Sequence, residues 1–345
     1  MDFHFELFQY SIIQLLNENS YFFRFGFWSF FLEINNNSSI PTMPQGDAKH
    51  IAKLRNEGIV SFLIMSTLLF CVHYFLHLST PVYVAVGIQM AVFFFHGLPN
   101  SSEKYFDISG SFTHLALVCT SLLSNSVIRS PRQIFISVAS IVWMTRLGSY
   151  LYARILKDGK DERMDNFKLT FVSWIQVWMF QAAWVTIIQL PILLLNAVDD
   201  SSHSSVSLID GICIVLWIVG FIIEVMADTE KMVFRSQAKN KHKYITTGIW
   251  SVSRHPNYFG EILMWVSLAL MTSNAGLDHT NSKYFFHAAL FSPLFTFLLL
   301  RFVSGVPMVE KAGQKKWGSD TNYVKYMKET SMIVPWFAPN GIKRE

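Results

Sequence analysis

Apolar runs recur along the chain from about residue 58, and short polar segments separate them. Most runs are close to 20 residues, the length with which a helix crosses a bilayer. Because unpaired backbone groups are costly in lipid, such runs form helices rather than open strands. The expected spans are residues 58–79, 82–98, 109–128, 133–154, 170–197, 207–227, 257–274 and 284–304. The pattern therefore predicts an all-α integral membrane protein with about seven to eight transmembrane helices.

Two features modify this pattern. The fifth run is long, and we expect it to bend at Pro191. Residues 1–45 are apolar in part but carry interrupting polar residues, and an Asn/Ser stretch at 35–39 reads as a linker. Their acidic opening is unlike the start of a signal peptide. We therefore expect an N-terminal appendage and linker over 1–45 and a single multi-pass domain over 46–345.

The loops predict an orientation. With eight spans, the polar segments 46–57, 99–108, 155–169, 228–256 and 305–345 share one side of the membrane. That side holds most of the lysines and arginines, whereas the other side holds Asp199, Asp200, Asp210, Asp278 and few cations. The excess of cations on the cytosolic side of membrane proteins places the first group of segments in the cytosol.

Composition agrees with a membrane protein. Hydrophobic residues make up 51% of the chain and charged residues only 15%, against about a quarter in soluble domains. The net charge of +4 comes from loop cations, so it indicates topology and no nucleic-acid partner. The three cysteines lie within apolar runs and form no CxxC pair, so we expect neither a disulfide framework nor a metal site.

Ionisable residues inside spans are the first candidates for function. Glu224 and Asp228 are four residues apart at the cytosolic end of the sixth span, so both carboxylates share one helix face. Arg146 lies about two turns deeper in the fourth span than Arg154, too deep to reach the headgroups easily. We expect Arg146 to face the bundle and bind an anionic or polar ligand.

The segment from Gly248 to Glu261 concentrates polar chemistry at the start of a helix. Pro256 suits the first helical position, which places Arg254 and His255 at the positive end of that helix. Free N–H groups, the helix dipole and Arg254 together predict an anion site, such as one for a phosphate.

Two other cytosolic segments offer candidates. Tyr105 and Asp107 precede the third span, where either could donate a proton or orient a reacting group. Glu310, Lys311 and Tyr323 follow the last span, either as an interfacial belt or as a lid over an aqueous ligand. The common nucleotide and hydrolase motifs of soluble proteins are absent from the sequence. A nucleotide site would therefore be built from helix ends and loops.

Several segments together resemble the DUF1295 membrane proteins, which belong with the superfamily of the steroid five-alpha-reductase C-terminal domain. They are Gly248–Trp250 with Ser253–Glu261, Phe106–Ser111, Thr145–Gly148, Ala227–Lys231, and Ser304–Lys311 with Lys316–Gly318. The resemblance covers roughly residues 58–337. It implies an all-helical membrane fold with a cytosol-facing cofactor cleft.

In the steroid reductases that cleft holds NADPH, and the resemblance carries their residues to this chain. An asparagine and an aspartate four apart, followed by an arginine, correspond to Glu224, Asp228 and Arg235, so glutamate replaces the asparagine. Their Asn-Phe-Leu-Gly-Glu segment corresponds to residues 257–261. Their catalytic glutamate and tyrosine have no counterpart that we can assign here.

Two alternatives remain open. The Arg-His-Pro-x-Tyr segment is also similar to isoprenylcysteine and phospholipid methyltransferases, in which it helps to bind S-adenosylmethionine. Those enzymes usually have paired glutamates after the last span, whereas this chain has Glu310 followed by Lys311. A lysine suits a phosphate better than a sulfonium, which favours NADPH. The second alternative is a non-catalytic scaffold that binds lipid or sterol.

We therefore expect a multi-pass endoplasmic reticulum oxidoreductase that uses NADPH to reduce an activated C=C bond in a lipid or sterol-like substrate. Arg254, Arg235 and Lys243 would neutralise phosphates, and Asp228 and Asn257 would bind ribose or amide groups. The expected cofactor-binding residues are Arg146, Glu224, Asp228, Arg235, Lys243, Arg254, His255, Asn257, Glu261, Glu310, Lys311 and Tyr323. The expected catalytic residues are Tyr258, Tyr105 and Asp107, with either tyrosine as proton donor.

Overall fold

The computed structural model describes residues 48–123, 129–161, 164–198, 206–278 and 283–335, so the predicted N-terminal appendage lies outside the described residues. Within these ranges the chain is helical, with no strand. The α-helices are α4 (Ala48–Phe75), α5 (Ser79–Val92), α6 (Phe106–Leu123), α7 (Pro131–Asp158), α8 (Phe171–Ile188), α9 (Leu190–Asn196), α10 (Leu208–Ser236), α11 (Pro256–Asp278), α12 (Lys283–His287), α13 (Phe291–Leu298), α14 (Val306–Trp317) and α15 (Thr321–Glu329).

Among the described residues, seven helical segments are long and apolar enough to cross a membrane. They are Ala48–Phe75, Ser79–Gly97, Phe106–Leu123, Pro131–Ala153, Phe171–Ile188, Leu208–Ser236 and Phe285–Trp317. The prediction of a helical membrane bundle is thereby confirmed.

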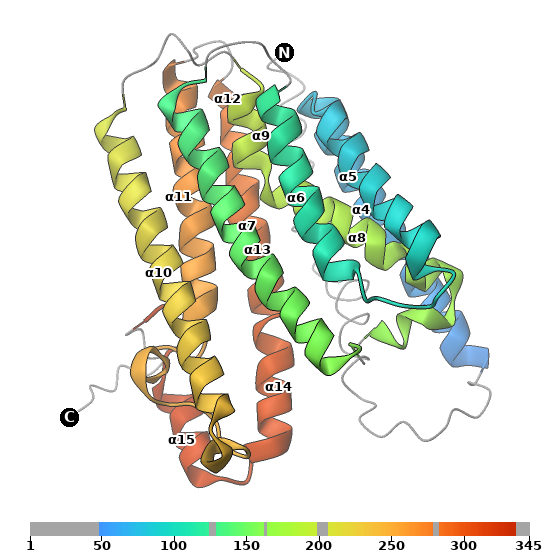
Figure 1. Ribbon diagram of the computed structural model, residues 1–345, viewed down its shortest axis with the longest axis vertical. Coiled ribbons are helices and arrows are strands. Elements are labelled where there is room, and N and C mark those ends of the chain that lie inside the picture. The colour runs from blue at the N-terminus through green and yellow to red at the C-terminus, as the bar shows by residue number, and fades with distance from the viewer. Residues whose placement is uncertain (1–47, 124–128, 162–163, 199–205, 279–282, 336–345) are drawn as a thin grey trace, which may run out of the picture.

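The predicted span over 257–274 is not one of these seven, although it forms the helix α11. This helix runs beside α10 through the bundle (Figure 1). Its lower hydropathy reflects polar residues that face the interior, where Ser267 and Thr272 are fully buried. A helix that packs against protein on several sides needs less apolar surface than one that faces lipid.

The fifth apolar run bends as expected. Helix α8 ends at Ile188 and α9 begins at Leu190, with Pro191 in the first turn of α9. These two helices are buried along most of their length. One apolar cluster joins α8 to α4 and α5, and a second joins α9 to α6, α7, α10 and α11. Helices α8 and α9 thus form the centre around which the other spans pack.

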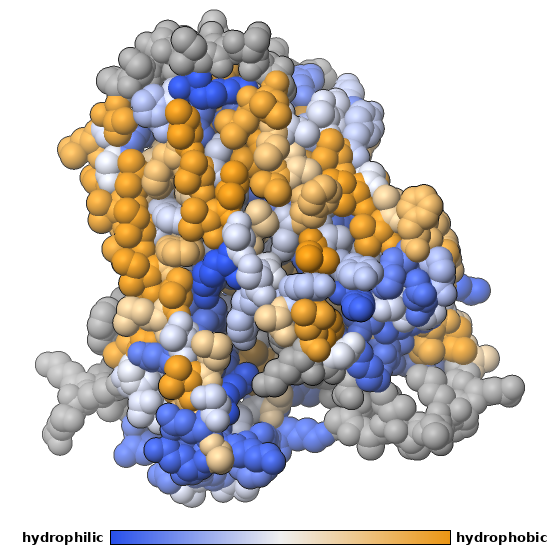
Figure 2. Space-filling model, viewed as in Figure 1, coloured by the Kyte–Doolittle hydropathy of each residue, from blue (hydrophilic) through white to orange (hydrophobic). Residues whose placement is uncertain are grey.

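Polar segments gather at one end of the bundle. Helices α14 and α15 lie there with the segment that follows α10 (Figure 1). The surface at this end is hydrophilic, whereas the helices above it are covered by apolar residues (Figure 2). The loops before α6 and after α7 are joined, because Glu103 lies 2.5 Å from Lys168 Nζ and accepts a hydrogen bond of 2.6 Å from the Asp161 amide.

Candidate functional site

Arg146 of α7 reaches across to α10, where its guanidinium contacts the carboxylates of both Glu224 and Asp228. The three residues lie in largely apolar stretches of α7 and α10. Even so, the Arg146 side chain is 21% exposed and the Asp228 side chain is 19% exposed. The structure therefore brings together three residues that the sequence singled out. Arg146 faces the bundle, as expected, but it is paired with carboxylates of its own chain.

Helix α11 completes this group. The Asn257 side-chain amide donates to Asp228 Oδ1 at 3.3 Å. Glu261, one turn further on, is an electrostatic neighbour of Glu224, Asp228 and Arg146. We call these five residues, Arg146, Glu224, Asp228, Asn257 and Glu261, the acid cluster. It contains three carboxyl groups and one guanidinium.

Two glycines allow α10 and α11 to approach closely enough to form the acid cluster. A Cβ atom on Gly260 would lie 2.5 Å from the Gly220 carbonyl oxygen, and one on Gly220 would lie 2.7 Å from the Gly260 carbonyl oxygen. Small residues at such contacts are typical of closely packed membrane helices. Any larger side chain at either position would separate the helices and with them Glu224 from Glu261.

The acid cluster has unused hydrogen-bonding capacity. Glu224 Oε2 and Asn257 Oδ1 are buried and have no hydrogen-bond partner among the described residues. Buried acceptors without a donor destabilise a protein, so they are rare unless a ligand or water fills the need. The cluster can therefore bind a group that offers hydroxyl or amide N–H donors.

Arg254 and His255 contact the C-terminal segment. Glu310 of α14 lies 2.9 Å from Arg254 Nη1 and 3.1 Å from His255 Nε2. Burial lowers the pKa of His255, and the hydrogen bond to Glu310 opposes this effect. The Arg254 amide also donates to the Ser331 carbonyl at 2.8 Å. The start of α11 is thus covered, and the Glu310 carboxylate already pairs with one end of the Arg254 guanidinium.

The Gly-Ile-Trp part of the sequence signature positions this start of α11. Gly248 has a φ of 61°, and a Cβ atom there would lie 2.3 Å from the Glu230 carboxylate. That carboxylate accepts a 3.0 Å hydrogen bond from the Ile249 amide. The Trp250 indole donates to the Ala227 carbonyl of α10 at 3.0 Å. Glycine is therefore needed so that the loop can lie directly on α10.

Cations lie toward the polar end of the bundle, and one of them, Lys231, is an electrostatic neighbour of both Asp228 and Arg235. Arg235, Lys243 and Lys311 are exposed. Lys231 lies 4.5 Å above the Trp250 ring and is an electrostatic neighbour of His255. We call Lys231, Arg235, Lys243 and Lys311 the cationic rim. Together with the acid cluster, the rim gives an acceptor-rich interior next to a positively charged surface.

The remaining predicted residues lie in different places. The Tyr258 ring stacks on the His255 ring, with centroids 5.0 Å apart. Tyr323 packs against Tyr244 at 4.9 Å, and burial raises its pKa. Tyr105 is 37% exposed, and its ring packs on His96 with centroids 4.4 Å apart. Of the two tyrosines expected as proton donors, Tyr258 is therefore the one next to the predicted cofactor residues.

Asp107 lines an internal cavity of about 230 Å³ between α6, α7 and α8. Sequence reasoning missed this cavity and the buried His114 in its wall. A lone histidine in an apolar run gives no signal that separates a core residue from a ligand-binding one. Within the described residues, no group of three His, Cys, Asp or Glu side chains is placed to hold a metal ion.

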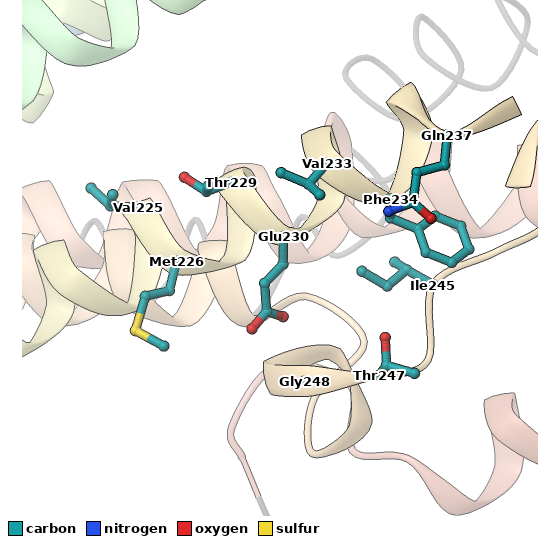
Figure 3. Close-up of a pocket in the computed structure, with 10 residues that line it drawn as sticks. All are labelled: Val225, Met226, Thr229, Glu230, Val233, Phe234, Gln237, Ile245, Thr247 and Gly248. Atoms are coloured by element: carbon teal, nitrogen blue, oxygen red, sulfur yellow. The ribbon is translucent and has the colours of Figure 1, made fainter.

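A larger groove of about 700 Å³ lies on α10 outside the acid cluster (Figure 3). Its lining is mainly apolar and includes Met226, Val233 and Phe234. The Glu230 side chain points toward the Gly248 loop (Figure 3), in agreement with its hydrogen bond to the Ile249 amide. The one carboxylate of the groove thus has a structural partner, so the acid cluster is the stronger candidate site.

A family model described as a protein of unknown function, DUF1295, matches residues 93–330. The chain belongs to the DUF1295 family. The match includes α6 to α15 and with them every residue of the acid cluster and the cationic rim. It begins later than the resemblance noted in the sequence, which started at about residue 58. No curated protein and no solved structure matched the chain.

Proposed function

We propose that this DUF1295 protein is an NADPH-dependent reductase of an activated C=C bond in a membrane-borne lipid or sterol-like substrate. The observation that carries the proposal is the pairing of unused buried acceptors in the acid cluster with the cationic rim beside it. A dinucleotide has the matching chemistry, because its ribose hydroxyls and carboxamide are donors and its phosphates are anions.

The interior would hold the uncharged part of the cofactor. Glu224 Oε2 and Asn257 Oδ1 can accept hydrogen bonds from a carboxamide or a ribose. Asp228 is held in place by Arg146 and Asn257, so its carboxylate is oriented without any ligand. NADPH, when bound, supplies the hydride.

The rim would hold the phosphates. Arg235 lies in the last turn of α10, Lys243 follows that helix, and Lys311 comes from α14. Arginine and lysine side chains form strong charge-assisted hydrogen bonds with phosphate oxygens. Arg254, which pairs with Glu310, would join them. Tyr258 Oη would hold the proton that reduction requires. By the positive-inside rule, the rim would face the cytosol from the endoplasmic reticulum membrane.

One observation favours a second candidate, an S-adenosylmethionine-dependent methyltransferase. The acid cluster has three carboxyl groups for one guanidinium. An excess of acid suits a sulfonium cation better than it suits a polyanion. The cationic rim favours NADPH instead, because S-adenosylmethionine has no phosphate groups for these cations to bind.

Thermal unfolding of the purified protein tests the proposal. A ligand that binds only the folded protein raises its free energy of unfolding by about 2.7 kcal/mol at a hundredfold excess over Kd. We expect NADPH to raise the midpoint of wild type, and Arg235→Ala to weaken NADPH binding by about tenfold or more. Lys53→Ala is the matched control, because Lys53 is an exposed cation on α4.

The outcomes separate the candidates. A rise with S-adenosylmethionine but not with NADPH would replace the reductase by the methyltransferase. No rise with either ligand would favour a lipid-binding scaffold. An equal loss of NADPH response in Arg235→Ala and Lys53→Ala would contradict the assignment of phosphates to the rim.

A further inference from the structure

The cavity of about 230 Å³ between α6, α7 and α8 is separate from the acid cluster and shares no residue with it. Its wall is mostly apolar and aromatic. Its polar side chains include Asp107, Ser111, His114 and Gln181. Typical pockets for drug-sized molecules measure about 300–1,000 Å³. This cavity is therefore sized for one end of a lipid and not for a whole sterol.

His114 gives the cavity a defined hydrogen-bonding character. Its ring is 2% exposed and lies edge-on between Trp143 and Trp184, with both centroid distances 5.4 Å. The Gln189 side-chain nitrogen lies 2.9 Å from His114 Nδ1. An amide nitrogen can only donate, so Nδ1 accepts, and the ring proton is carried by Nε2.

This Nε2–H group is buried and has no hydrogen-bond partner among the described residues. Leaving a buried donor unpaired is unfavourable. The Ser140 hydroxyl lies 2.7 Å from Gln189 Nε2 and 3.1 Å from Gln189 Oε1, so it holds the Gln189 amide beside Nδ1 and away from Nε2. Gln189 therefore holds the His114 ring so that its Nε2–H group is available to donate to an acceptor atom.

The cavity adjoins the acid cluster. Trp143 lines the cavity, and its indole N–H also interacts with the Glu224 carboxyl. One side chain thus separates His114 from the acid cluster. A molecule that ends at His114 would lie beside Trp143, whose indole N–H edge faces the Glu224 carboxyl.

The burial of the wall indicates the direction of access. His114, Trp143 and Gly110 are buried, whereas Leu151, Asp107 and Ser304 are partly exposed. The inner end is therefore closed around the imidazole, and the outer end opens near the polar end of the bundle. A lipid would enter with one end leading.

We propose that this cavity binds the carbonyl end of an α,β-unsaturated ketone lipid, and that His114 Nε2–H donates a hydrogen bond to the carbonyl oxygen. This inference rests on the proposed reductase function, because a C=C bond becomes activated when it is conjugated to a carbonyl. A hydrogen bond to the oxygen draws electrons from that bond. It also satisfies the unpaired donor of His114, so recognition and activation use one contact.

Infrared spectroscopy tests the contact without any cofactor. The probe is cyclohex-2-enone labelled with ¹³C at the carbonyl, and cyclohexene is the control ligand without an acceptor. We expect a saturable carbonyl band at lower frequency than the probe shows in an alkane solvent, because a hydrogen bond weakens the C=O bond. His114→Phe should remove that band and weaken binding by about tenfold. His73→Phe, a histidine of α4 in contact with Tyr83, should change neither.

Leu151→Trp gives an independent variant if His114→Phe does not fold, because Leu151 is partly exposed and lies at the outer end of the cavity. It should reduce the band by blocking access. A shifted band of wild-type intensity in a folded His114→Phe or Leu151→Trp protein would overturn the assignment.

The same samples keep the two proposals apart. His114→Phe should retain the rise of the midpoint with NADPH, because His114 is no part of the acid cluster. If wild type shows the shifted band but no response to NADPH, the cofactor proposal fails and the carbonyl site stands. If the response to NADPH is present and the band is absent, the carbonyl site fails alone.

Discussion

Helices α7 and α10 are joined by arginine–carboxylate pairs at two levels, and the two levels differ. Arg132 pairs with Asp210 near the starts of the helices, and Arg146 pairs with Glu224 near their middles. Fourteen residues separate the two arginines, and fourteen separate the two acids. At 1.5 Å per residue, the levels are about 21 Å apart.

The first level is closed. The Arg132 and Asp210 side chains are 4% and 0% exposed, with 3.1 Å between Nε and the carboxylate. Asp210 also accepts hydrogen bonds from the Ser207 amide and hydroxyl and from Asn274 of α11. These partners occupy its oxygen atoms. Such a pair holds helices together and has nothing left to offer a ligand.

The second level is open. Arg146 is 21% exposed, a third carboxyl group from Glu261 lies beside it, and two buried acceptors have no partner among the described residues. The comparison teaches that a charge inside a membrane helix is insufficient to identify a site. The unused acceptors and the surplus of acid distinguish the functional candidate.

The largest expected effect comes from a substitution at the closed level, where we expect the free energy of unfolding to fall. Asp210→Asn removes the carboxylate that lies 3.1 Å from Arg132 Nε. Breaking a buried ion pair on one side costs about 3–5 kcal/mol. We expect the free energy of unfolding, measured by denaturant titration in detergent, to fall by about that amount, while the thermal response to NADPH remains. A stable variant that no longer responds to NADPH would reverse the roles of the two levels.

The matched change at the open level is Glu261→Gln. Here the substitution replaces the Glu261 carboxyl group, whose ionised form is disfavoured by burial and by the neighbouring Glu224 and Asp228 carboxyl groups, with a neutral amide. We expect the free energy of unfolding to rise by up to about 1 kcal/mol. The same titration measures it, with Asp210→Asn as the comparison. A loss as large as that of Asp210→Asn would mean that the open level is as structural as the closed one.

The smallest effect concerns pH. Burial lowers the pKa of His255 in the folded protein, against the opposing influence of Glu310 and with Arg254 and Lys231 nearby. The unfolded chain has a histidine pKa of about 6.5, so below that pH it takes up the proton before the folded protein does. Stability due to His255 is therefore present above about pH 6.5 and is lost as the pH falls.

Thermal midpoints between about pH 8 and about pH 5 measure this loss. The fall in midpoint should be smaller in His255→Gln than in wild type. A wild type that becomes more stable than His255→Gln at low pH would show that a charged pair with Glu310 dominates instead.

The bundle was predictable because the length of an apolar run reports directly on a membrane span. Glu224 and Asp228 were predictable as well, since a spacing of four on one helix places them on one face. The partner of Arg146 was not, because Glu224 lies 78 residues away in the sequence. The same holds for Arg254, whose partner Glu310 belongs to α14.

Local signals also had limits within the spans. The capping box of Ser130 and Gln133, with Pro131 between them, fixes the start of α7, but it does not show which residue α7 faces. His114 lies in an apolar run whose pattern is the same for a core residue and for a ligand-binding one. Its unpaired Nε2–H becomes visible only once Gln189 is placed beside it.

The two levels of pairing also restrict the relative motions of the helices in the bundle. A helix attached to its neighbour at one point can swivel about it, whereas attachment at two distant points prevents both sliding and tilting. The two ion pairs therefore resist movement of α7 relative to α10. We expect any widening that admits a lipid to the cavity beside His114 to come from displacement of α6 or α8, which form other walls of that cavity.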